Sequence, residues 1–460
     1  MSKQDLSRRD FIRKTTGVAA AAAATTATVK TAQASPSIVK NIMPASVMGA
    51  NEKILTGHIG LGGMGKRDLQ LAINTKVIQP IHTCDLITRF AEQGADITQG
   101  MGGYERPKTT DNFEEVIENK DVDAVVIVTP DHWHTIPTLM ACEAGKDVWT
   151  EKPLTTTIGE GIPVMKAVRD NKTVFQCGNF QRSGVHFQEV VQMVQEGYIG
   201  NIGRVETWYH DPVNKPMSPG KTKPAPPFWD RYLGWTEKVP YNSNRFLYNF
   251  RWFLDYSGGK MTDWGAHLID IAVWAMGEDN PPREVTAVGG NYVIDDERTT
   301  PDTLDVLYKF DNYVLSFANR VWNGVTDEPS PHGIRFHGDK GTLYCDRKGY
   351  KVTEANNSGI EEKSVSDVKE GTMNAAHWQN WIDCIKSRKD PICFVESAFN
   401  TAKVCHMGTS AYVAGGKLGW DDEKLKFTGT DEAAVKAAND FAYRPYQNGY
   451  SLEKGKYLPA

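Results

Sequence analysis

The sequence predicts a two-domain α/β protein, with a doubly wound parallel sheet first and an α/β domain with a large open, mainly antiparallel sheet second. Apolar strand-like runs alternate with helix-like runs from residue 53 to residue 175, which is typical of a doubly wound parallel sheet. From about Glu284 to Val352, apolar and polar residues alternate, which is typical of strands with one solvated face. The 460 residues are enough for two domains or more.

A glycine-rich turn comes after the first predicted strand, Ile54–Ile59, and precedes a helix-like run. Its six residues are Gly60, Leu61, Gly62, Gly63, Met64 and Gly65, which fit the pattern G-x-G-x-x-G. In this pattern the first glycine permits a tight turn, the second lets the backbone approach a pyrophosphate, and the third lets the helix pack closely on the strand. The helix N-terminus faces the negative charge. Glycine-rich turns are common, so the prediction of a dinucleotide site also needs an acidic residue after the next strand.

Such an acidic residue ends the sequence VIQPIHTCD, the second predicted strand. Asp85 stands 20 residues beyond Gly65, where a carboxylate binds the ribose hydroxyls of an adenosine. The same carboxylate would repel a 2′-phosphate, so the sequence favours NAD over NADP. Arg89 lies nearby and keeps NADP as an alternative. Without a nucleotide, Asp85 would be a turn residue or a helix cap.

Other polar residues stand where predicted parallel strands end. Thr129 and Pro130 come after the apolar run Ala124–Val128, and Glu151 and Lys152 come after the next predicted strand. Ligands of doubly wound sheets bind beyond the carboxyl ends of the strands. We therefore expect these four residues to line the same cleft as the glycine turn.

The stretch YSGGKMTDWGAHLIDIAVWAMG has helical apolar spacing after its glycine pair. Asp263 and His267 stand at positions i and i+4, so their side chains are expected to meet on one helix face. A carboxylate that orients a histidine ring and supports its charged form suits proton transfer. From the spacing alone, a structural hydrogen-bonded pair stays open, as does a metal site completed by His132 and His134.

Four motifs occur in order along the chain: IGLGGMG, VIVTPDHWH, ACEAGKDVWTEKPL and GGKMTDWGAHLIDIAVWAMG. In these residues the chain resembles the Gfo/Idh/MocA oxidoreductases, the family of glucose–fructose oxidoreductase and inositol dehydrogenase. The resemblance runs from about Lys53 to the C-terminal region. It implies a Rossmann domain that binds NAD and a catalytic set of Lys152, Asp263 and His267. It also implies that Lys152 reaches the nicotinamide and the substrate hydroxyl, and that the bond from Lys152 to Pro153 is cis.

The resemblance further implies binding roles for residues that no spacing argument singles out. It places the segment GNFQR near the nicotinamide and the substrate, with Asn179 expected on the cofactor and with Gln181 and Arg182 expected on the substrate. His134 is expected at the cofactor edge or as a capping residue. Because hydride transfer to NAD needs no metal, no metal is expected.

Aromatic residues predict the rest of the substrate site. Tyr209 and His210 stand at the exit of the predicted strand GRVETWYHD. The stretch after this strand is too rich in proline for a core element, so we expect a loop. This loop is either a lid, in which Trp229 and Tyr232 stack on a sugar, or a surface excursion or oligomer arm. The family commonly associates through the exposed face of its second sheet, which implies a homodimer or homotetramer.

The N-terminus predicts export. The basic segment SRRDFIRK precedes an apolar run rich in Ala and Thr and the sequence AQA, which together form a secretory signal. The pair Arg8 and Arg9 marks the twin-arginine type, whose Tat machinery carries folded proteins. The run is too weakly apolar to span a membrane. The predicted division is a signal peptide over 1–34, a linker over 35–52, an NAD-binding domain over 53–175, a substrate and oligomerisation domain over 176–420 and a C-terminal extension over 421–460.

Composition indicates the compartment in which the protein folds and excludes some classes of partner. The seven cysteines are an odd number without close pairing, as in a protein that acquires its fold in a reducing compartment before export. The formal net charge is −5, and loss of the basic signal would make it more negative. Nucleic acid and anionic membrane surfaces are therefore not expected as partners.

These observations lead to the hypothesis of a periplasmic NAD-dependent oxidoreductase for a sugar, polyol or glycoside. His267 takes the hydroxyl proton, Lys152 holds the oxygen and Asp263 positions the pair. Because free NAD is scarce outside the cytoplasm, we expect the cofactor to be loaded before export, held tightly and recycled on the enzyme. Two alternatives stay open: an NAD-dependent glycosidase that oxidises its sugar transiently, and a non-catalytic sugar-binding protein with the same fold.

Overall fold

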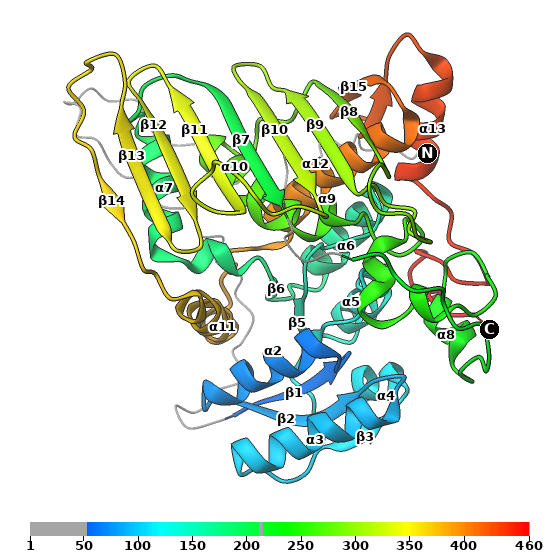
Figure 1. Ribbon diagram of the computed structural model, residues 1–460. Coiled ribbons are helices and arrows are strands. Elements are labelled where there is room, and N and C mark those ends of the chain that lie inside the picture. The colour runs from blue at the N-terminus through cyan, green and yellow to red at the C-terminus, as the bar shows by residue number, and fades with distance from the viewer. Residues whose placement is uncertain (1–52, 211–214, 460) are drawn as a thin grey trace, which may run out of the picture.

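The structure, a computed structural model, describes residues 53–210 and 215–459. The signal peptide and linker predicted over residues 1–52 lie outside these residues. Two sheets organise the described chain (Figure 1): one of six parallel strands and one of ten mostly antiparallel strands. The fold class predicted from the sequence is therefore confirmed.

The first sheet has the strand order β3-β2-β1-β4-β5-β6, so the direction of winding reverses between β1 and β4. A ligand crevice is expected at such a switch point, beyond the carboxyl ends of the strands. The apolar runs of β4 and β5 are buried at every residue, as expected for strands covered on both faces. The strands and helices of this part are β1 (Ile54–Ile59), α2 (Gly63–Asn74), β2 (Ile78–Cys84), α3 (Thr88–Gly102), β3 (Lys108–Thr110), α4 (Phe113–Glu118), β4 (Ala124–Ile127), α5 (Thr135–Glu143), β5 (Asp147–Thr150), α6 (Ile158–Asp170) and β6 (Phe175–Cys177).

The second sheet has the strand order β14-β13-β12-β11-β7-β10-β9-β8-β15-β16, and only the pair of β7 and β10 is parallel among its described pairings. Its strands are β7 (Ile202–His210), β8 (Glu284–Gly290), β9 (Thr303–Lys309), β10 (Val314–Arg320), β11 (His332–Gly338), β12 (Gly341–Asp346), β13 (Gly349–Glu354), β14 (Ser364–Val365), β15 (Lys417–Asp421) and β16 (Lys426–Thr428). The accompanying helices are α7 (Val185–Gln195), α8 (Trp229–Leu233), α9 (Lys260–Asp263), α10 (Gly265–Met276), α11 (Glu370–Ser387), α12 (Val395–Ala414) and α13 (Glu432–Ala442).

The second sheet is covered on one face only. Along β9, buried and exposed residues alternate, because every second side chain points into the core. Helices α7, α10 and α12 pack against the buried face, and Figure 1 shows them behind the strands. On the other face, Val288 and Leu307 are exposed. This one-sided burial is the physical cause of the apolar and polar alternation in the sequence.

Helix α11 joins the two halves of the protein. It follows β14 in the chain and runs beside α2 of the first half (Figure 1). Trp378 of α11 stacks on Trp149 of β5 with ring centroids 4.1 Å apart. Stacked, buried tryptophans of this kind contribute packing beyond their buried area. The contact fixes the second domain relative to the strand that ends at the predicted catalytic lysine.

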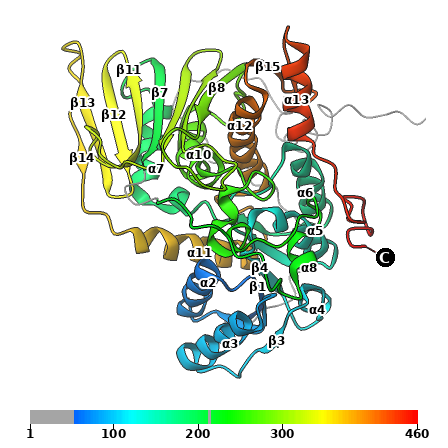
Figure 2. The same cartoon turned by 45° about the vertical axis from the view of Figure 1, so that its right-hand side comes forward.

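The chain beyond residue 421 also connects the two halves. β16 extends the second sheet, α13 packs on α12, and the tail then descends past α6 (Figure 2). Tyr446 in this tail stacks on Trp235 at 4.4 Å. Among the described residues, no helix combines the length and apolar character that crossing a bilayer requires.

Candidate active site

The glycine turn has the geometry of a dinucleotide site. Gly60 has φ +87°, and a Cβ on it would lie 2.4 Å from the Val128 carbonyl oxygen. A Cβ on Gly65 would lie 2.0 Å from the carbonyl oxygen of Gly60, so helix and strand approach too closely for any side chain. At Gly62 and Gly63 a Cβ would meet nothing within 4 Å, which leaves open space in front of the helix N-terminus. The residues present therefore fit a pyrophosphate cradled by backbone.

Asp85 closes this turn from the next strand. Its Oδ2 accepts the backbone N–H of Leu61 at 2.7 Å, and its Oδ1 accepts that of Ile87 at 2.8 Å. Burial raises the pKa of Asp85, and the two backbone N–H groups oppose this shift. Each carboxylate oxygen keeps a further lone pair for a ribose hydroxyl.

One cavity of about 910 Å³ runs from the glycine turn to the predicted catalytic residues. Of the predicted cofactor and catalytic residues, those in its lining are Gly60, Gly62, Gly63, Met64, Gly65, Asp85, Thr129, Pro130, His134, Glu151, Lys152, Asp263 and His267. The side chain of Leu61 is instead fully buried in the core, and its contribution is the N–H that it donates to Asp85. Arg89, the residue that kept NADP as an alternative, lies over the Phe90 ring at 5.3 Å and does not line the cavity. The cavity size is within the range of small-molecule sites.

Asp263, at the end of α9, holds together the charged groups of the cavity. Its Oδ1 lies 2.6 Å from Lys152 Nζ, and its Oδ2 lies 3.2 Å from Lys260 Nζ and 3.4 Å from Arg251 Nε. Burial alone would raise the pKa of Asp263, but Lys152, Lys260 and Arg251 outweigh burial and hold that pKa well below its ordinary value. The ionised carboxylate therefore fixes the position of the Lys152 ammonium.

The predicted contact between Asp263 and His267 is not formed. The helical run is broken at Trp264, so Asp263 ends α9 and His267 lies in the first turn of α10. The carboxylate faces the three cations, and the Nδ1 of His267 is buried without a hydrogen-bond partner. Lys152 and Arg251 come from other segments, and Lys260 comes from α9 itself; such cations attract a buried carboxylate more strongly than a neutral ring one turn away. The i, i+4 spacing could not reveal Lys152 and Arg251.

His267 lies in the cavity as a neutral base. Burial lowers its pKa well below the ordinary value, and the charges of Lys152 and Arg347 lower it further. The imidazole is therefore neutral at neutral pH, which is the protonation state that a general base requires. The Phe180 ring, 5.1 Å from the imidazole, helps to exclude water from it.

Two further acids in the cavity titrate near neutrality. Burial raises the pKa of Asp131 to about 7, although Ser257 donates a hydrogen bond to its Oδ2 at 2.6 Å. Burial likewise raises the pKa of Glu151 to about 7, against the opposing charge of Lys152. Asp131 lies within the motif VIVTPDHWH, but no role was predicted for it. Only its burial in the folded protein distinguishes it from an ordinary surface acid.

Asn179 and Gln181 support the site from behind. Both are buried, and neither lines the cavity. The amide of Asn179 donates to the Ala266 carbonyl at 2.8 Å, and that of Gln181 donates to the His267 carbonyl at 3.1 Å. These bonds hold the first turn of α10, which carries His267. The cofactor and substrate contacts that the resemblance implies for the two residues stay predictions.

Arg182 is a core residue of the second domain. Its guanidinium is 1% exposed and lies 2.7 Å from Asp270 and 2.6 Å from Glu278. The Nε and Nη2 groups of Arg182 are both paired with carboxylates, and Arg182 does not line the cavity. Arg182 therefore lies away from the cavity, because α10 supplies an acid that the local sequence GNFQRS does not show.

Trp229 also lies outside the cavity. It stacks on Tyr232 at 5.2 Å and donates its indole N–H to the Val239 carbonyl at 2.9 Å, within a buried aromatic cluster. Tyr232 does line the cavity. The Pro-rich stretch thus contributes one of the two rings expected of a lid, while Trp229 anchors that stretch.

His134 joins two of the strand ends that were predicted to meet. Its Nδ1 lies 2.7 Å from the Pro153 carbonyl oxygen and its Nε2 lies 3.0 Å from the Thr129 carbonyl oxygen. Burial lowers the pKa of His134 to about 4. The peptide bond between Lys152 and Pro153 is cis, as the resemblance implied. His134 therefore lies at the cavity edge as a positioning residue.

The segment from Phe246 to Arg251 also lines the cavity and was not predicted from the sequence. The Arg251 guanidinium lies 4.0 Å from the centroid of the Tyr248 ring and also reaches Asp263. No motif marks this segment, which belongs to the long stretch between β7 and α9. An arginine between aromatic residues, in YNFRWF, was the available signal.

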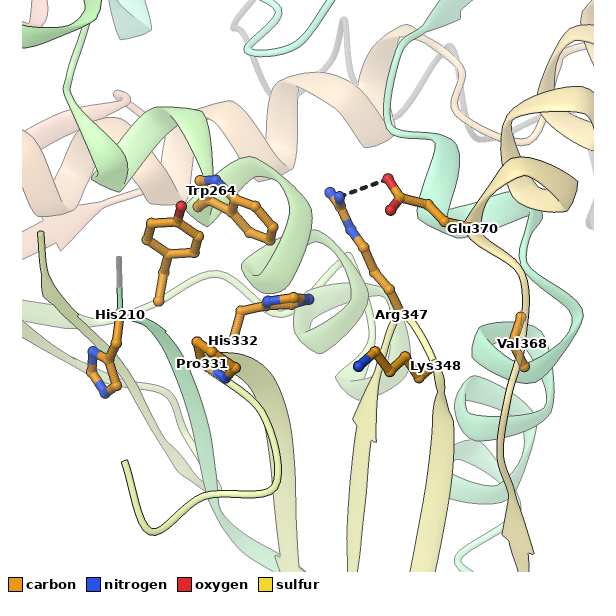
Figure 3. A pocket seen from close by; sticks show the side chains of 9 residues that line it. His210, Trp264, Pro331, His332, Arg347, Lys348, Val368 and Glu370 are labelled. Carbon is orange, nitrogen blue, oxygen red and sulfur yellow. Dashed lines mark hydrogen bonds and ion pairs between the residues drawn. The ribbon is translucent and has the colours of Figure 1, made fainter. Parts of the chain in front are cut away.

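Tyr209 and His210 line a neighbouring cavity of about 500 Å³ (Figure 3). Trp264, Arg347 and Glu370 belong to the lining of both cavities, so the two adjoin. Across residues 53–210 and 215–459, no group of three or more His, Cys, Asp or Glu side chains is arranged to hold a metal ion.

Comparison with known protein families shows the family to which the chain belongs. The oxidoreductase family with an NAD-binding Rossmann fold matches residues 54–179, and the C-terminal alpha/beta domain of that family matches residues 205–448. The chain belongs to the Gfo/Idh/MocA oxidoreductase family. Its first half is an NAD-binding Rossmann domain, in agreement with the open cradle in front of α2.

Curated relatives are about 25% identical to the chain over the aligned residues. An uncharacterized oxidoreductase of Streptococcus pneumoniae is 25% identical over 250 residues, which are 54% of this chain and 58% of that protein. The scyllo-inositol 2-dehydrogenase (NAD(+)) of Bacillus subtilis is 26% identical over 292 residues, which are 62% of this chain and 74% of that protein. Levoglucosan dehydrogenase in complex with NADH and levoglucosan has a TM-score of 0.63 at 19% identity, covering 80% of this chain and 99% of that chain. The last comparison shows a shared fold.

Proposed function

We propose that this protein is a periplasmic NAD-dependent oxidoreductase that oxidises a hydroxyl-bearing carbon of a sugar, polyol or glycoside. The observation that carries the proposal is one cavity that combines the glycine turn, the anchored ammonium of Lys152 and the neutral imidazole of His267. The names of the relatives, an inositol dehydrogenase and a levoglucosan dehydrogenase, support the substrate class.

His267 takes the proton in the proposed reaction. The neutral ring accepts the hydroxyl proton while the C–H bond of the same carbon breaks and a carbonyl forms. NAD, when bound, accepts the two electrons and the hydrogen of that C–H bond as hydride. General base assistance of this kind contributes about 10²–10⁴-fold to a rate.

Lys152 holds the reacting oxygen. Its ammonium has three N–H donors, and two of them have acceptors on Asp263, at 2.6 Å to Oδ1 and 3.0 Å to the backbone oxygen. The third donor is left for the substrate oxygen, and the positive charge stabilises the developing alkoxide. Asp263 acts through Lys152 and is therefore a positioning residue.

Export with a bound cofactor explains the combination of a twin-arginine signal and an NAD site. The pair Arg8 and Arg9 supports export of the folded protein. The segment around Tyr248 and the tail residues Leu458 and Pro459 all line the cofactor cavity, which supports slow release of the nucleotide. A retained cofactor is recycled on the enzyme, either by a second substrate or by return of the hydride to the same sugar.

The test is performed on protein purified from the periplasm. Denaturation should release close to one NAD or NADH per chain, identified by mass spectrometry, and a panel of sugars, polyols and glycosides should then include one that raises the fluorescence of bound NADH. Release of NADP alone, or no fluorescence change with any compound, would refute the proposal.

Export is tested separately with the double variant Arg8→Lys, Arg9→Lys, which should stay in the cytoplasm. An unchanged periplasmic yield would remove the Tat part of the proposal. Product analysis with a reactive glycoside separates net oxidation from hydrolysis, because the glycosidase alternative releases a free sugar without net reduction of an acceptor.

A further inference from the structure

The second cavity has no role in the proposed hydride transfer. It lies at the ends of β7 and β11 and at the turn from β12 to β13, and its volume is about 500 Å³. In Figure 3, Trp264, His332, Arg347 and Lys348 converge on it, whereas His210 points away from them. This volume is within the range of pockets that bind small molecules.

The second cavity continues from the catalytic one. Glu370 marks the junction, because it accepts a hydrogen bond from Arg347 at 2.9 Å and lies 3.9 Å from Arg67 of α2. Arg67 lines the catalytic cavity, while Arg347 and Glu370 line both. A ligand that reacts beside His267 and extends past Trp264 would therefore enter the second cavity.

The walls offer ring surfaces and neutral hydrogen-bonding groups. Tyr209 stacks on Trp264 with centroids 4.2 Å apart, and His332 lies 4.7 Å from Trp264. Burial and, to a smaller extent, the charge of Arg347 lower the pKa of His332 to about 4, so the ring is neutral near pH 7. Aromatic walls with a few polar groups that fix orientation are typical of sites for small organic ligands.

Positive charge exceeds negative charge in the second cavity. Arg347 and Arg67 share one carboxylate, that of Glu370. Lys348 is exposed, and its ammonium forms no ion pair within 4.0 Å among the described residues. The neighbouring Asp346 is buried, and its Oδ1 accepts the N–H groups of Lys348 and Gly349. A concave site lined by an excess of one charge attracts ligands of the opposite charge.

We propose that the second cavity is a subsite for an anionic sugar residue, so that the substrate is a glycoside whose neutral residue reacts at Lys152 and His267 while a carboxylate on its other residue lies beside Lys348 and Arg347. The inference rests on the proposed function, because it assigns the substrate class of the same site. The nearest chemical class is an aldobiouronic acid, a disaccharide with one uronic acid residue.

The experiment compares each neutral disaccharide with the aldobiouronic acid of the same linkage, using reduction of the bound NAD as the readout. The acidic member should have a kcat/KM about tenfold higher, which corresponds to about 1.4 kcal/mol. In Lys348→Gln the ratio of acidic to neutral kcat/KM should fall toward one. Lys351→Gln, on the exposed side of β13, is the matched control and should keep the ratio. Added salt should lower the ratio in the native protein.

Equal kcat/KM values for the two members, or a preference that survives in Lys348→Gln, would overturn the inference while leaving the proposed function intact. If no sugar reduces the bound NAD, the proposed function fails, and calorimetric binding of the same disaccharide pair to the native protein and to Lys348→Gln still decides the inference. Tighter binding of the acidic member that depends on Lys348 would support the subsite, and equal binding would refute it.

Discussion

The two halves of the catalytic cavity are built differently. The cofactor half is formed by one continuous turn from Gly60 to Gly65 and by Asp85, and its geometry depends mostly on backbone. The substrate half is formed by side chains from distant segments, with Lys152 after β5, Arg251 before α9 and His267 in α10. A backbone site can be predicted from glycine spacing, whereas a side-chain site depends on ion pairs that only the folded chain brings together.

The largest effect is expected from the base of the substrate half. His267→Ala should slow reduction of bound NAD by about 10²–10⁴-fold while the protein still folds and keeps its nucleotide. Because the pKa of His267 is held well below its ordinary value, this group should cause no loss of native kcat/KM as pH falls to 6.5. The measurement is the rate of NADH fluorescence increase from pH 5 to 9, with Asp131→Asn as a control for the neighbouring acid. A native rate in His267→Ala would show that the ring is structural.

Substitution of Lys152 should slow reduction of bound NAD nearly as much. Lys152→Met should lower the same rate by about 10²–10³-fold, because the developing alkoxide loses its cation. The matched control is Lys260→Met, which removes another cation from Asp263 but lies outside the cavity lining. Its effect on the rate should be much smaller. Equal losses in both variants would mean that Lys152 only balances the charge of Asp263.

Substitutions at two glycines of the cofactor half should have different effects, one on stability and one on nucleotide binding. Gly65→Ala should destabilise the fold by about 1–3 kcal/mol, because its Cβ would meet the Gly60 carbonyl oxygen at 2.0 Å. Gly62→Ala should leave stability nearly unchanged, because φ is −65° and the space is open, but should reduce the nucleotide retained per chain. Denaturant unfolding of the nucleotide-free variants measures the change in stability. Mass spectrometry of the nucleotide released from the variants as purified measures retention. Full retention in Gly62→Ala would contradict the assignment of the cradle.

A further effect concerns the pH dependence of stability. The folded-state pKa of Asp131, about 7, lies above the ordinary value of 3.8, so its contribution to stability is present below about pH 4 and is lost as pH rises through 7. Asparagine does not titrate, so Asp131→Asn does not lose this stability as the pH rises. The unfolding free energy of the variant minus that of the native protein should therefore be about 2–4 kcal/mol greater at pH 8 than at pH 4. Denaturant unfolding at both values measures the difference. A difference that does not change with pH would show that Asp131 is ionised in the folded state.

Much of the fold could be predicted because its signals are local. The switch from helical to strand periodicity marked the two sheets, and the positions of Asp85, Thr129 and Lys152 at strand ends placed them in one crevice. Prediction was weaker wherever a partner came from far along the chain. Arg182 was expected on the substrate, but Asp270, 88 residues away, takes its guanidinium into the core. Asp263 was expected on His267, but Lys152, 111 residues away, takes its carboxylate.

The segment around Tyr248 illustrates a different limit. Several of its residues are aromatic, but their place in the cavity lining depends on the path of the whole stretch between β7 and α9. Trp229 had the composition expected of a sugar-stacking lid, yet it packs into the aromatic cluster that supports this stretch. Aromatic residues in a Pro-rich segment therefore indicated that the segment is structured, but could not show which ring reaches the cavity.

In the proposed reaction, a sugar carbon gives its hydrogen directly to a nucleotide held beside Lys152 and His267. The most direct measurement mixes the exported protein with deuterated members of the reactive sugar class and determines the mass of the nucleotide released on denaturation. We predict NADH that carries one deuterium in the native protein, and almost none in His267→Ala at the same time point. Unlabelled NADH from native protein that has oxidised the deuterated sugar would contradict direct hydride transfer.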